Sequence, residues 1–122
     1  MNNFLFFDEM KDIFLDLLSH KSDLPIDIDD LSINYNRSLE ELLIKQLTLL
    51  HLKTKLLALA KNNDDELAMQ SALLRLRTHA MSLSSFFDNI VEDTEVILRT
   101  GTWPEFPEDY KIPNHYNESE FK

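Results

Sequence analysis

The chain has 122 residues, a net charge of −10, one glycine and no cysteine, and 43% of its residues are hydrophobic. This length fits a single domain that is large enough to bury a core. One glycine is too few for the turns of a β protein or for a phosphate-binding loop. The lack of cysteine excludes disulfides and thiolate zinc sites.

A first helix is predicted over residues 3–20, because apolar side chains recur there at helical spacing. His20 and Lys21 at its end suit the helix dipole. The apolar residues 4–7 are followed at once by the acidic Asp8 and form a run far shorter than a membrane span. We therefore expect a soluble, cytoplasmic protein.

Residues 22–37 interrupt the helical pattern. Pro25 stops a helix, and apolar and polar residues then alternate. A lone strand would not be stable in water. This segment is therefore expected to be an extended connector that lays its apolar side chains on the helices.

A second helix is predicted from Leu39 to Lys61, because Ser38 and Glu41 have the spacing of a capping box. Two rows of leucine predict a helix that is buried on two sides. The first row contains Leu43, Leu47, Leu50 and Leu57, and the second contains Leu42, Leu49, Leu52, Leu56 and Leu59.

A long helix is predicted from Asp64 to Thr100, after a short turn that makes an antiparallel hairpin and with a second capping box at residues 63–66. Gly101 is expected to end it, and the heptad phase favours continuity through residues 82–85. Apolar residues alternate at spacings of four and three, the pattern of a coiled-coil seam. The seam consists of Met69, Leu73, Leu76, Ala80, Leu83, Phe87, Ile90, Thr94 and Ile97.

These elements predict an all-α fold, in which a long antiparallel helical hairpin and a shorter N-terminal helix form a three- to four-helix bundle over residues 1–101. Residues 102–122 hold three prolines among aromatic residues, so they are expected to form an irregular tail. The tail either packs on the bundle, with Trp103 and Phe106 as core cover, or binds a partner.

No constellation for catalysis, cofactor binding or metal binding is found. The chain contains no Glu-x-x-His, no His-Glu-x-x-His and no acidic loop with EF-hand spacing. The acids at i, i+4 and i+7 in residues 88–95, and those spaced by four residues in 8–16, are expected to be solvated helix faces. The sequence therefore predicts a protein that is not an enzyme and has no cofactor.

The run from His79 to Ser85 resembles the phosphoacceptor motif of histidine phosphotransfer domains, which reads roughly His-x-Leu-Lys-Gly-Ser-Ser. This resemblance implies that His79 is an exposed phosphoacceptor on a helical bundle. The sequence departs from the motif at Ser82, where the family has lysine, and at Leu83, where it has glycine. A degenerate phosphotransfer protein is therefore an alternative function.

The main functional hypothesis is a non-catalytic protein–protein interaction module, such as an adaptor, a chaperone, an immunity protein or an assembly factor. The second helix is too short to cover the whole long helix, and uncovered leucine rows favour a homodimer. The candidate interface residues are Leu49, Leu52, Leu56, Ile90, Ile97, Trp103, Phe106 and Tyr110.

Charge is spread unevenly along the chain. Residues 1–44 carry ten acids and three bases (−7), residues 45–79 three acids and six bases (+3), and residues 80–122 nine acids and three bases (−6). Direct nucleic-acid binding is not expected from this balance. The alternative is an acidic inhibitor that mimics nucleic-acid charge and blocks a basic protein.

Overall fold

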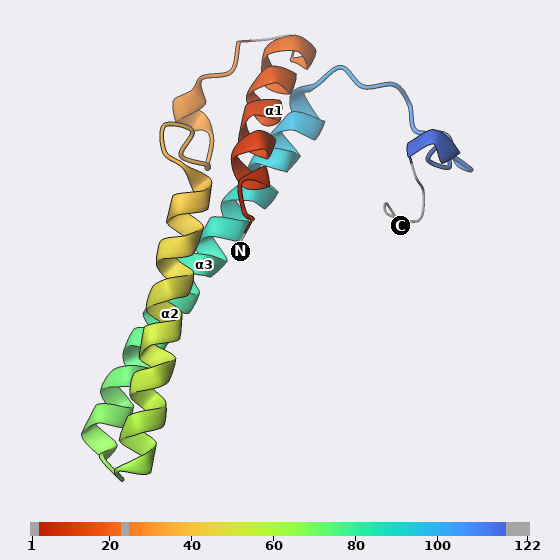
Figure 1. Cartoon of the computed structure of the whole chain (residues 1–122). Helices are drawn as coiled ribbons and strands as arrows, with labels where there is room; N and C mark the ends of the chain where they lie inside the picture. Colours follow the sequence, from red (N-terminus) through yellow and green to blue (C-terminus); the bar gives the residue numbers. More distant parts are fainter. Residues whose placement is uncertain (1–2, 23–24, 117–122) are drawn as a thin grey trace.

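The structure is a computed structural model that describes residues 3–22 and 25–116. The described chain contains the helices α1 (Phe6–Lys21), α2 (Leu39–Asn62) and α3 (Glu66–Thr100), and the 3-10 turns η1 (Ile28–Asp30) and η2 (Asn114–Tyr116). Helices α2 and α3 form a long antiparallel hairpin, and α1 lies beside the upper part of α3 (Figure 1). The predicted all-α hairpin with a shorter N-terminal helix is confirmed.

The helix ends follow from local side-chain hydrogen bonds. The Ser38 hydroxyl accepts the backbone N–H of Glu41 at 3.2 Å, as its cap position predicts. The predicted second capping box is wrong, because Asp65 caps α3 by accepting the N–H of Ala68 at 3.1 Å. Asp64 closes the hairpin turn in the left-handed region, with φ 53°, and so moves the cap beyond residue 63.

Helix α3 runs unbroken through residues 82–85, as the heptad phase predicted. The serine hydroxyls do not break it, because such groups can bond within the helix. The hydroxyl of Ser82, for example, donates to the carbonyl of Thr78 at 3.2 Å.

The core lies where the three helices and the connector meet. Ile33 and Tyr35 of the connector are buried against Phe7 of α1 and against Leu39 and Leu43 of α2. The prediction that the connector lays apolar side chains on the bundle is therefore confirmed. It is not extended throughout, because η1 forms a helical turn within it.

The predicted seam of α3 is only half right. One heptad column, Met69, Leu76, Leu83, Ile90 and Ile97, does turn inward, and its members are buried or half-buried. A second column also faces the interior, and each of its members comes three residues after a member of the first column, whereas the prediction placed it four residues after. We call this second column the inner row, and it consists of Ala72, His79, Phe86 and Asp93. The column predicted from sequence, Leu73, Ala80, Phe87 and Thr94, faces outward except for the half-buried Thr94, and we call it the outer row.

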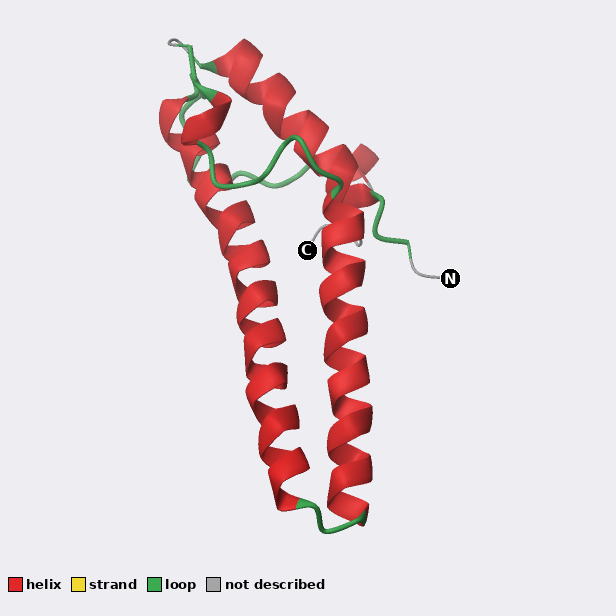
Figure 2. Cartoon of the chain, turned by 90° about the vertical axis from the view of Figure 1, so that its left-hand side faces the viewer, coloured by secondary structure: helices red, strands yellow, loops and turns green. Residues whose placement is uncertain are grey.

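The prediction that α2 is buried on two sides is wrong. Only Leu39, Leu43 and Ala60 of α2 are buried, and Leu52 and Leu59 are exposed. Helix α1 accounts for the difference, because it lies along the part of α3 that extends past the start of α2 and leaves the rest of the hairpin without a third helix (Figure 2). We call residues 45–79, which form this two-helix part, the distal hairpin.

Candidate interaction surface

The connector is attached to α3 by the carboxylate of Asp93, whose residue is only 1% exposed. The carboxylate accepts the backbone N–H of Ser32 at 2.7 Å, the N–H of Ile33 at 2.9 Å and the hydroxyl of Tyr35 at 2.8 Å. The Ser32 hydroxyl also donates to the carboxylate of the neighbouring Glu92. Asp93 can therefore take a place in the inner row, because its charge is satisfied by buried donors.

The carboxylate of Asp93 also affects the pKa of Tyr35. Burial raises the pKa of the Tyr35 hydroxyl, and both its hydrogen bond to Asp93 and the charge of Asp93 raise this pKa further. The tyrosine therefore stays a neutral donor throughout the physiological pH range.

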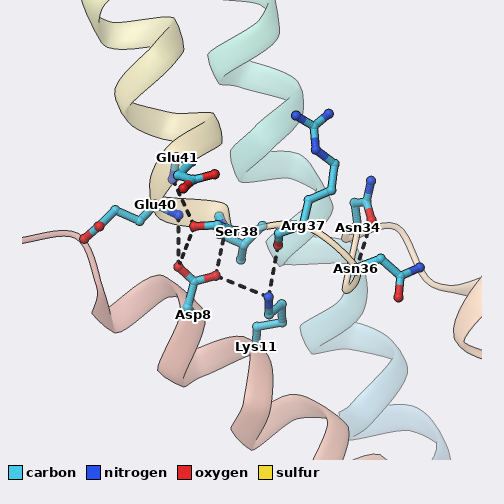
Figure 3. A network of polar contacts seen from close by, with 9 residues as sticks. Asp8, Lys11, Asn34, Asn36, Arg37, Ser38, Glu40 and Glu41 are labelled. Atoms are coloured by element: carbon cyan, nitrogen blue, oxygen red, sulfur yellow. Dashed lines mark hydrogen bonds and ion pairs between the residues drawn. The ribbon is translucent and has the colours of Figure 1, made fainter.

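A second carboxylate, Asp8 of α1, attaches α1 to the start of α2 (Figure 3). It accepts the backbone N–H of Leu39 at 2.8 Å and that of Glu40 at 3.1 Å, and it pairs with the ammonium of Lys11 at 3.3 Å. Burial opposes ionisation, but these hydrogen bonds outweigh it, and the pKa of Asp8 is lowered. The prediction that Asp8 belongs to a solvated face is therefore wrong.

The upper end of the molecule is closed around Gly101. A Cβ at this position would lie 2.2 Å from the Trp103 indole nitrogen, so only glycine leaves room for that ring. The indole N–H donates to the carbonyl of Ile97 at 3.1 Å, and the ammonium of Lys21 lies 5.3 Å from the ring centre. The backbone N–H of Thr102 donates to the carbonyl of Lys21 at 2.8 Å and joins the ends of α1 and α3.

Beyond Trp103 the tail leaves the bundle (Figure 1). All its described residues up to Tyr116 are exposed, and Phe106, at 79%, does not cover the core as predicted. Phe106 instead packs edge-on against Tyr110, with ring centres 5.4 Å apart. These two aromatic residues lie next to Leu98 and Trp103 on the surface.

The structure separates the predicted interface residues into three groups. Leu49 and Leu56 of α2 are half-buried, and Leu52 between them is 51% exposed. Ile97 is buried within the chain and Ile90 packs on the core, so the proposal of an interface along that seam is wrong. The three tail residues Trp103, Phe106 and Tyr110 are exposed but lie at the opposite end from the distal hairpin.

The exposed outer face of α3 was missed in the sequence, because the prediction placed the outer row inside. Leu73 is 54% exposed, and Phe87, Val91 and Leu98 are also exposed along the same face. The heptad pattern gave no signal for this face, because the inner row contains the polar residues His79 and Asp93 and the outer row is the more apolar of the two.

His79 lies in the inner row, half-buried, with its Nδ1 3.3 Å from the side-chain oxygen of Gln46. The resemblance to phosphotransfer domains requires an exposed imidazole. Among residues 3–22 and 25–116, no three histidine or acidic side chains are grouped so that they could hold a metal ion. None of the helices in this part of the chain combines the length and the apolar character that a membrane span needs.

Comparison with protein-family models, with curated proteins and with solved structures finds no match to this chain. The fold defines an all-α hairpin protein.

Proposed function

We propose that the protein is a non-catalytic interaction module that associates with a second copy of itself. The observation that carries this proposal is the distal hairpin, which is two helices thick and exposes large apolar side chains on both helices. The exposed residues are Leu47, Leu52, Leu59, Leu67, Leu73 and Leu74, followed by Met81 just above them. Exposed apolar rows of this extent usually mark a protein interface.

The packing between α2 and α3 supports this interpretation. Ala72 is fully buried and Ala60 nearly so, whereas His79 meets Gln46 farther up. Small and polar residues therefore fill much of the contact between α2 and α3 in the distal hairpin, and most of its leucines are exposed on either side of this contact. Such an arrangement is typical of a hairpin whose leucines are covered by a second layer.

The size of this surface is adequate for a dimer. Twenty-four residues of α2 span about 36 Å, and two adjacent helices are about 20 Å wide, so one face of the hairpin is roughly 700 Å². Standard interfaces bury about 600–1,000 Å² on each partner, and the area of this face lies within that range.

The mass in solution tests the proposal. Light scattering at micromolar concentration is expected to give twice the chain mass of 14.3 kDa. A mass that stays at 14.3 kDa up to about 100 µM, in the affinity range of weak complexes, would refute self-association.

A second candidate is the acidic inhibitor, which the distribution of charge in the fold favours. Among the described residues, 3–22 and 25–44 carry nine acids and three bases (−6) and 80–116 carry seven acids and two bases (−5), and these parts lie in the half of the molecule away from the hairpin turn (Figure 1). Asp8 and Asp93 are engaged in internal hydrogen bonds, so exposed acids such as Asp29 and Asp30 would have to do the binding. This function predicts a complex with a basic protein that dissociates in high salt, whereas the self-association is expected to persist there.

A further inference from the structure

We propose that two copies of the chain pair through the outer face of α3, antiparallel, about a twofold axis beside Ala80 and Ser84. This inference rests on the proposed self-association and specifies its surface and orientation. The residues concerned continue the outer row along α3 at alternating spacings of three and four, and we call them the outer strip. The outer strip consists of Leu73, Arg77, Ala80, Ser84, Phe87, Val91, Thr94 and Leu98.

The outer strip has the pattern of a coiled-coil seam, although no segment among the described residues of its own chain covers most of it. Phe87 is 47% exposed, Val91 53% and Leu98 64%, and only Thr94 is half-buried. Phe6 of α1 is also exposed and stacks on Phe7, whose ring lies 6.3 Å from that of Phe87.

The order of side-chain sizes along the strip favours this axis. Ala80 and Ser84, the third and fourth of its eight residues, have small side chains, which allow two helices to approach most closely. Larger apolar residues lie on both sides of them. In the antiparallel arrangement, Leu73 of each copy therefore meets Val91 of the other.

Charge determines the direction of the pairing. Residues 45–79 have a net charge of +3, and the two flanking segments have −7 and −6. A parallel pair would place like ends together, whereas the antiparallel pair places each basic end on the acidic end of the other copy. With Leu73 of one copy opposite Val91 of the other, Arg77 of each copy reaches Asp88 of its partner. The twofold axis produces this contact twice in the dimer.

The length of the outer strip determines how much area α3 can bury in a dimer. From Leu73 to Leu98 the strip spans about 39 Å of helix about 10 Å wide, so α3 contributes roughly 390 Å² per copy. The exposed Leu74, which lies next to Leu73 and Arg77, adds to this area, and a standard interface takes about 800 Å² from each partner.

Cross-linking tests the orientation, and the natural lack of cysteine makes introduced thiols unambiguous. We expect a disulfide between chains when a Leu73→Cys chain is mixed with a Val91→Cys chain under mild oxidation. Neither variant alone is expected to cross-link, because Leu73 lies far from its own symmetry mate. A Leu73→Cys chain that cross-links to itself would overturn the antiparallel arrangement.

A charge exchange provides an independent readout. Arg77→Asp and Asp88→Arg are each expected to weaken the dimer about tenfold, and the double variant is expected to restore it. Arg77 and Asp88 are exposed, so the circular dichroism of all three variants should match that of the parent chain. Failure of the double variant to recover affinity would contradict the proposed register.

Two leucine variants separate failure of this inference from failure of the proposed function. Leu73→Glu is expected to abolish the dimer, and Leu52→Glu on the other helix is the matched control, expected to retain it. A dimer that survives Leu73→Glu but not Leu52→Glu would refute the outer strip and leave self-association intact. A parent chain that is monomeric by mass would refute both.

Discussion

Replacement of Asp93 by alanine is expected to be the most destabilising single change described for this protein. The variant would leave the backbone N–H groups of Ser32 and Ile33 and the hydroxyl of Tyr35 without their acceptor. Each buried donor without a partner costs about 1–3 kcal/mol. Water can reach part of the opened connector, so we expect a total loss of about 3–6 kcal/mol, a large part of the stability of a typical domain.

Urea unfolding followed by circular dichroism measures this loss. All variants must be compared at one protein concentration, because self-association stabilises the folded state by mass action. Glu95→Ala is the matched control, since this acid is exposed on the same helix, and its effect is expected to stay within about 0.5 kcal/mol.

A double-mutant cycle with Tyr35→Phe isolates one of the three hydrogen bonds. The single Tyr35→Phe change is expected to cost about 1–2 kcal/mol and to have less effect when Asp93 is already alanine. A loss below about 1 kcal/mol for Asp93→Ala would refute the view that this carboxylate holds the connector on α3.

Three further predictions follow from other contacts. Asp8→Asn is expected to cost about 1 kcal/mol at pH 7. Because folding lowers the pKa of Asp8 from 3.8, the stabilisation by its carboxylate is lost as the pH falls through the pKa of the folded state. In a pH series, the urea midpoint of the variant should therefore fall less at acidic pH than that of the parent chain. Gly101→Ala should displace the single tryptophan, Trp103, and shift its fluorescence to the red; an unchanged spectrum would contradict the close packing at this glycine. Leu76→Ala is expected to cost about 1–3 kcal/mol and Leu73→Ala less than about 1 kcal/mol in the monomer, and equal losses in urea titrations would mean that both side chains face inward.

The sequence by itself determined the helices and their connections. Ser38 and Glu41 fixed the start of α2, and the unbroken heptad phase predicted that α3 continues through its serines. These features depend on residues close together in the chain, so local hydrogen bonds and periodicity are sufficient to find them. The inward direction of Leu76 and Leu83 was predicted for the same reason.

Only the tertiary structure decided which second column of α3 is buried. Either His79, three residues after Leu76, or Ala80, four residues after it, could belong to the second buried column. Periodicity alone favours Ala80, because its side chain is apolar. The structure chooses the inner row instead, because Asp93 in that row binds backbone N–H groups of a connector about sixty residues away in sequence. That hydrogen bonding satisfies a buried charge, and it leaves Leu73 and Phe87 facing outward, where a second chain can cover them.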